Sequence, residues 1–116
     1  MGMRIDTLVN ILNAKVLTPE LDLQREVEFA FTSDLMSDVL TGDHESTVLI
    51  TGLSNLQAIR TAEMSDIGEV IVGRNKVVSE EMIELARENG IILLSCAYSL
   101  FRISGILYEK GVKALF

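Results

Sequence analysis

From residue 46 onward, short runs rich in β-branched residues alternate with segments long enough to form helices. The runs TVLIT, EVIV and IILLS are continuously apolar or nearly so, as expected for parallel strands whose two faces are both covered. Successive parallel strands are joined by right-handed crossovers, which leaves few topologies for such a chain. The alternation predicts an α/β fold: a three-layer α/β/α domain with a mainly parallel central sheet that includes residues 47–51, 69–72 and 91–95.

The helix after the second of these runs has clear start and stop signals. Ser79 can cap its N-terminus, and Glu80 and Glu81 then occupy the first turn, where negative charge is favourable. Gly90 follows the last apolar position and suits the end of a helix. We therefore expect the next strand to begin at once, at Ile91.

The first 45 residues are less regular, but two amphipathic helices and two strands are indicated. The first helix has its apolar face at Ile5, Leu8, Val9 and Leu12. The second is expected to be capped near Ser33 and to end at Gly42, with its apolar face at Leu35, Met36, Val39 and Leu40. Between them, AKVLTPEL predicts a short strand that ends at the proline, and EVEFAFTSD predicts a second strand.

Size and charge limit the functions open to this chain. Its 116 residues, 48% of them hydrophobic, suit one domain spanning residues 1–116. A formal charge of -7, with the basic residues scattered, argues against nucleic acid and membrane surfaces as partners. The single cysteine excludes an internal disulfide, and the N-terminus lacks the pattern of a signal peptide, so we expect a cytoplasmic protein.

The chain resembles the DRTGG domain family in the order and spacing of three segments. These are TSDLMSDVL, STVLITG and EVIVGRNKVVSEEMIELARENGIILLSC, and the resemblance covers nearly the whole length. Family members often carry a glycine-rich turn after the third strand, where this chain has Val72, Gly73 and Arg74. The resemblance extends to the N-terminal domain of HPr kinase/phosphorylase and to the DRTGG domain of CBS-containing pyrophosphatases.

The resemblance implies a noncatalytic module for regulation and subunit contact. Stand-alone members are sometimes described as hydrogenase-associated or iron-sulfur proteins. A single Cys96 cannot supply the thiolates of a cluster, so no cofactor is expected. No set of residues with metal-ligand spacing is found either.

A ligand site, if the domain has one, is expected at the carboxyl ends of the strands, where open parallel sheets bind ligands. The residues there are Thr51, Gly52, Ser54, Asn55, Gly73, Arg74, Asn75, Ser95, Cys96 and Ser99. Arg74 is the nearby positive charge, which favours a small anionic effector such as a nucleotide. The complete glycine and lysine signatures of phosphate-binding loops are missing, and ordinary turn and cap chemistry explains the same residues.

Two further residues each have a structural and a chemical interpretation. Cys96 follows a strand and precedes a helix, where a thiol can become reactive, but a buried small apolar residue is favoured because no histidine partner accompanies it. His44 lies in the polar stretch TGDHEST and is expected to be a solvated surface group rather than a metal ligand.

The C-terminal segment, predicted to be helical from Tyr98 to Glu109, is apolar on more than one face. One stripe contains Leu100, Ile103 and Leu107, and a second contains Phe101, Ser104, Gly105 and Tyr108. The second stripe predicts a homodimer interface, with another protein partner as a further candidate. The alternative is that the N-terminal helix covers this stripe within one chain.

Two functions remain open at this point. The first is a noncatalytic regulatory or interaction domain that forms a homodimer and binds a small effector at the strand ends. The alternative is a small cytoplasmic enzyme that uses Cys96 or an acidic residue in the same cleft. The absence of a base, a metal set and a phosphate loop from the sequence favours the first.

Overall fold

The computed structural model describes residues 2–39 and 44–116, and its centre is a sheet of the order β2-β7-β6-β5-β4-β8. The four middle strands are parallel, with β4 at Phe29–Thr32, β5 at Thr47–Thr51, β6 at Glu69–Val72 and β7 at Ile92–Ser95. At the edges, β8 (Lys113–Ala114) is parallel to β4, and β2 (Lys15–Val16) is antiparallel to β7. A separate antiparallel pair joins β1 (Met3–Arg4) to β3 (Glu26–Val27).

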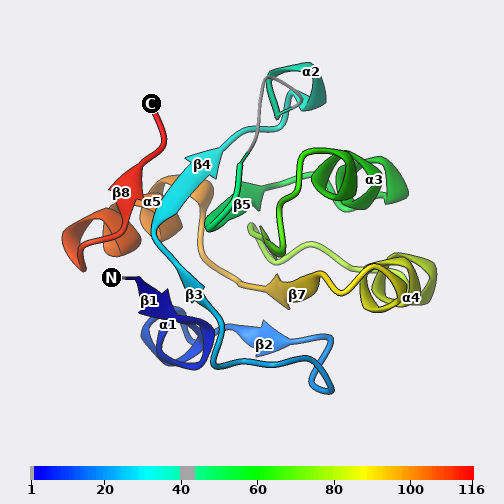
Figure 1. The fold of residues 1–116 in the computed structure, drawn as a ribbon, viewed down its shortest axis with the longest axis horizontal. Coiled ribbons are helices and arrows are strands. Elements are labelled where there is room, and N and C mark those ends of the chain that lie inside the picture. Colours follow the sequence, from blue (N-terminus) through cyan, green and yellow to red (C-terminus); the bar gives the residue numbers. More distant parts are fainter. Residues whose placement is uncertain (1, 40–43) are drawn as a thin grey trace.

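Helices cover both faces of the sheet (Figure 1). One face carries α1 (Ile5–Leu12) and α5 (Leu100–Glu109), and the other carries α2 (Met36–Val39), α3 (Leu56–Met64) and α4 (Glu80–Glu88). No helix in the described part of the chain has the length and apolar character needed to cross a membrane. The three-layer α/β/α architecture predicted from the strand–helix alternation is confirmed.

Alternate residues of the central strands divide the core into two clusters. In β5, Val48 and Ile50 pack with α1 and α5, whereas Leu49 packs with the helices of the opposite face. All three side chains are fully buried. A strand that buries both faces needs no polar alternation, which explains the continuous apolar runs of the sequence.

The helix signals predicted around α4 are confirmed. The Ser79 hydroxyl accepts a hydrogen bond from the Met82 N–H at 3.2 Å and caps the helix. At the other end Gly90 has φ of +68°, a left-handed conformation that glycine adopts without steric cost. The chain then enters β7 at Ile92, one residue after the predicted start.

The segment around α2 differs from its prediction. The helix is a single turn that begins at Met36, and Leu35 precedes it as an exposed residue instead of joining its apolar face. Ser33 lies further upstream, where its hydroxyl accepts a hydrogen bond from the Leu35 N–H. Met36 and Val39 are buried as expected, while Leu40 and the predicted stop at Gly42 lie outside the described residues.

The prediction that His44 is a solvated surface group is wrong. Its side chain is buried, and its Nε2 lies 2.9 Å from the Val39 carbonyl oxygen. The ring stacks on Phe31, and Phe116 meets it edge-on from the end of the chain. These contacts come from distant parts of the sequence, so the polar neighbours of His44 gave no sign of them.

The edge strand β2 is joined to the sheet partly by a side chain. The Leu17 N–H donates to the Leu93 carbonyl at 2.9 Å, and the Leu93 N–H donates to the Thr18 hydroxyl at 3.0 Å. Thr18 is fully buried, and the residue after it is Pro19. The hydroxyl thus satisfies a buried N–H at the point where the strand ends.

Candidate functional site

The carboxyl ends of β5, β6 and β7 meet at one edge of the sheet, as the parallel order requires. Backbone hydrogen bonds join the segments that follow them: the Gly73 N–H donates to Thr51 O, and the Cys96 N–H donates to Val72 O. The Arg74 N–H donates to Tyr98 O at 2.8 Å, and the Asn75 N–H donates to Cys96 O at 3.1 Å. The structure therefore brings the three predicted loops together.

A carboxylate from a fourth segment occupies this edge. Asp34, just beyond the end of β4, accepts hydrogen bonds at Oδ1 from the Gly52 N–H at 2.6 Å and the Thr51 hydroxyl at 2.9 Å. Its Oδ2 lies 3.6 Å from Nη2 of Arg74. Asp34 was not among the predicted site residues, and its contacts make it the central group of the edge.

The Arg74 guanidinium lies against the backbone of Gly52. A Cβ placed on Gly52 would come within 2.7 Å of the guanidinium carbon, so a larger residue at this position would require the guanidinium to move. Arg74 and Asn75 both have positive φ, at 63° and 55°, which is uncommon for residues other than glycine. The turn thus fixes Arg74 beside Asp34 with about half of its side chain exposed to solvent.

Most other polar residues predicted for the site have structural partners. Asn55 caps α3 by accepting from the Ala58 N–H at 3.1 Å, and Ser99 caps α5 by accepting from the Arg102 N–H at 3.1 Å. The Ser54 hydroxyl donates to the Val77 carbonyl. These residues lie near the predicted edge, but their side chains serve the local fold.

Cys96 is buried beneath the edge. Its thiol donates to the Leu12 carbonyl oxygen at 3.4 Å, inside the cluster shared by α1 and α5. Ser95 ends β7 beside it, half-buried. The thiol faces the core, which matches the interpretation of Cys96 as a small apolar residue.

The buried carboxylate Glu69 lies at the opposite end of the sheet, where β6 begins. Burial raises the pKa of the Glu69 carboxyl above its ordinary value of 4.5, and the positive charge of Arg25 opposes the shift. Arg25 Nε lies 3.6 Å from Glu69 Oε2, and the same guanidinium donates to Gly90 O at 2.9 Å. Glu69 is therefore a structural carboxyl and does not belong to the strand-end edge.

The raised pKa of Glu69 leads us to predict how the stability of the fold changes with pH. Because its pKa is higher in the folded chain, the free energy of unfolding falls as pH rises from about 4.5 through the folded pKa, and then levels off. Glu69→Gln cannot ionise, so its stability relative to the parent should be more favourable at about pH 8 than at about pH 5. Urea unfolding at both pH values measures the difference, and an equal difference at the two would contradict the prediction.

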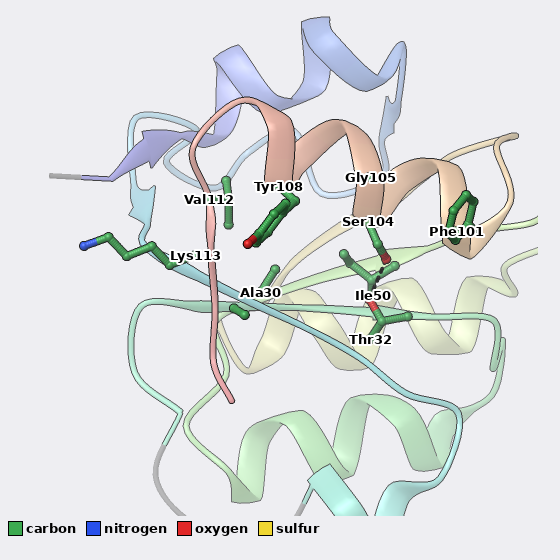
Figure 2. Close-up of a pocket in the computed structure, with 10 residues that line it drawn as sticks. Ala30, Thr32, Ile50, Phe101, Ser104, Gly105, Tyr108, Val112 and Lys113 are labelled. Atoms are coloured by element: carbon green, nitrogen blue, oxygen red, sulfur yellow. Dashed lines mark hydrogen bonds between the residues drawn. The ribbon is translucent and has the colours of Figure 1, made fainter.

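A second feature is an apolar groove between α5 and the β4–β8 edge of the sheet (Figure 2). Its volume is about 340 Å³. The lining residues are Ala30, Thr32, Ile50, Phe101, Ser104, Gly105, Tyr108, Val112, Lys113 and Ala114. All four residues predicted for an interface line this groove.

Two aromatic side chains border the groove and remain uncovered. Phe101 is 89% exposed and Tyr108 is 72% exposed, whereas Ile103 and Leu107 on the inner side of α5 are buried. The N-terminal helix α1 packs in the same cluster as these inner residues. Within one chain, α1 therefore covers the inner stripe of α5 and leaves the outer stripe open.

The centre of the groove is built from small side chains. The Ser104 hydroxyl donates to the Leu100 carbonyl at 2.7 Å and lies 2.7 Å from the hydroxyl of Thr32 on β4 (Figure 2). Gly105 is next to it and has open space where a Cβ would stand.

Among the described residues, no group of three or more His, Cys, Asp or Glu side chains is placed to hold a metal ion.

Comparison with known proteins places the fold. No family model and no curated protein matches the chain. A solved structure does match, with a TM-score of 0.70 and 17% sequence identity: the CBS and DRTGG domains of the regulatory region of Clostridium perfringens pyrophosphatase, complexed with the activator diadenosine tetraphosphate. The match covers 90% of this chain and 45% of the other, so this chain spans less than half of that region. The chain has a DRTGG-like α/β fold.

Proposed function

We propose that this chain is a single, noncatalytic regulatory domain that acts through contact with a second copy of itself. The observation that carries the proposal is the exposed aromatic pair, Phe101 and Tyr108, on the α5 side of an apolar groove. Exposed apolar surface of this kind is typical of an interaction site. Aromatic residues are also enriched among the side chains that dominate binding energy at interfaces.

The spacing of the groove residues on α5 favours a second copy as the occupant. Phe101 and Tyr108 are seven positions apart, about two helical turns, and the midpoint between them falls between Ser104 and Gly105. Two α5 helices that cross antiparallel at this midpoint place Phe101 of each copy against Tyr108 of the other. Such a contact is isologous, as two-fold dimers require, and the small central residues allow the helices to approach closely.

The structural neighbour supports a regulatory role. That protein's regulatory region binds an adenine dinucleotide activator, and the fold of this chain is similar. We propose that this domain also responds to a small anionic effector, at the strand-end edge that contains Arg74. The exposed part of the guanidinium is the group that would meet the anion.

The enzyme alternative has less support in the geometry. Cys96 is buried with its thiol bonded to a backbone carbonyl, and the buried carboxyl of Glu69 begins β6, away from the strand-end edge. A nucleophile needs an adjacent base and access to substrate, and neither accompanies Cys96 among the described residues. A single buried and unpaired cysteine fits a reducing compartment, so we propose a cytoplasmic location.

Light scattering coupled to size exclusion tests the proposed function. The expected mass is twice the 12.8 kDa of one chain at micromolar concentration, with a shift toward one chain on dilution. A mass of one chain throughout the series, including its most concentrated sample, would contradict self-association through α5.

A further inference from the structure

Asp34 supplies a negative charge at the place where an anionic effector is expected. Its carboxylate joins the ends of three neighbouring strands: it follows β4, its Oδ1 meets Thr51 and Gly52 after β5, and its Oδ2 faces Arg74 after β6. Asp34 is thus the carboxylate that contacts all three segments. An internal anion is thus already held at this edge.

The donors belong to the sheet and its turns and not to Asp34 itself. Thr51 is the last residue of β5, and the buried Gly52 follows it. Arg74 is fixed by its backbone hydrogen bond to Tyr98 O and by the left-handed turn. A main-chain N–H and a hydroxyl that meet one carboxylate oxygen, with a guanidinium near the other, are groups that favour an oxyanion. The strand that carries Thr51 and the turn that carries Arg74 are held by backbone hydrogen bonds that do not involve Asp34.

We propose that Thr51, Gly52 and Arg74 form an oxyanion-binding site, and that Asp34 fills it in the free protein as an internal substitute for a ligand. The ligand class is a compound with a phosphate or carboxylate group, which must displace Asp34 in order to bind. This inference rests on the proposed effector role and adds its mechanism. Binding of the ligand and release of the Asp34 segment become one event.

Solvent can reach the site, which allows an exchange of anions. The side chains of Asp34 and Arg74 are 40% and 46% exposed. Asp34 lies between β4 and the single turn of α2, and displacement of its carboxylate breaks the contacts named above. An internal group competes at a high effective concentration, about millimolar for a short flexible link. A simple anion should therefore bind the unaltered protein weakly.

Removal of Asp34 tests the inference directly. Inorganic phosphate is titrated by calorimetry into the unaltered full chain and into Asp34→Ala, which empties the site. We expect Asp34→Ala to bind phosphate at least about tenfold more tightly, equivalent to about 1.4 kcal/mol. Acetate is titrated in parallel, and tighter binding of either anion supports the site, while the preferred anion identifies the ligand class.

Two further variants serve as controls. Asp34→Asn removes the charge but leaves an amide oxygen in the same place, so it should bind phosphate far less tightly than Asp34→Ala. Asp34→Ala combined with Arg74→Ala should lose the gained affinity. If Asp34→Ala does not fold, Asp34→Ser is used in the same titration.

The inference is overturned if folded Asp34→Ala binds phosphate and acetate no more tightly than the unaltered chain. It is equally overturned if Asp34→Asn gains as much affinity as Asp34→Ala, because charge removal alone would then explain the result. The mass of each sample is recorded by light scattering. If the protein is a dimer but Asp34→Ala does not bind phosphate, only this inference is contradicted. If the protein is a monomer and Asp34→Ala binds phosphate, only the proposed self-association is contradicted.

Discussion

Replacement of Phe101 by glutamate should convert a dimer into a monomer without unfolding the chain. Phe101 is 89% exposed, so its loss removes little packing within one chain. In the dimer, each copy would place one charged side chain in an apolar contact. Loss of one interfacial hot spot costs about 2 kcal/mol, and two copies double this to about 4 kcal/mol, on the order of a thousandfold in Kd. Light scattering across a dilution series measures the change.

Val77→Glu is the matched control for this experiment. Val77 is also 89% exposed, but it lies in the loop between β6 and α4 and does not line the groove. The control should keep the mass of the unaltered protein, and both variants should keep its circular dichroism spectrum. If Phe101→Glu has the same dissociation constant as Val77→Glu, the groove is not the dimer interface.

Gly73→Val should destabilise the fold by about 1–3 kcal/mol, because the added side chain overfills a packed contact. An added Cβ at Gly73 would lie 2.8 Å from Leu100 Cδ2 and 2.9 Å from Ile103 Cδ1. Ile103 is fully buried, so its side chain cannot give way without displacing packed neighbours. Urea unfolding followed by circular dichroism measures the loss of stability.

Gly68→Val provides the comparison at a glycine that has room. A Cβ on Gly68 meets only Arg25 Nη1, at 3.8 Å, and the residue precedes the same strand. We expect its effect to be within about 0.5 kcal/mol, as for ordinary surface substitutions. Equal losses at both positions would mean that the approach of α5 to Gly73 is not the cause.

The central part of the fold was predictable because its signals are local. The β-branched run that forms β5 is buried on both faces, and such a continuous apolar run is typical of a covered parallel strand. Ser79 and Gly90 likewise mark the ends of α4 through bonds within a few residues. Where hydrogen bonds and burial depend on neighbours in sequence, the pattern of residues was sufficient.

The strand-end site was predicted only in part, because its central group comes from elsewhere in the chain. The convergence of Thr51, Gly52 and Arg74 follows from the parallel order, which the sequence indicates. Asp34 reaches Gly52 across 18 positions, and no spacing rule connects an aspartate after one strand with a glycine after the next. The burial of His44 was missed for the same reason, since Phe116 is 72 positions away (116 − 44).

One wall of the groove was predictable from the sequence, and the other was not. The second apolar stripe of α5 could be read from helical periodicity, and it is exposed as predicted. The opposite wall depends on β8, whose two exposed residues have no strand pattern of their own. Only the pairing of β8 with β4 shows that the stripe borders a groove.

The β4–β8 pairing also leads us to expect that parts of the chain form at different stages of folding. The strands β5 to β7 and their connecting helices occupy the continuous stretch 47–95, so their contacts close short loops. Ala30 pairs with Ala114, which closes a loop of 84 positions (114 − 30) for a ladder of two residue pairs. Such an edge opens in sub-global fluctuations well before the central strands do. We therefore expect the outer wall of the groove to assemble after the central strands, and a bound partner to slow hydrogen exchange there while leaving the central strands unchanged.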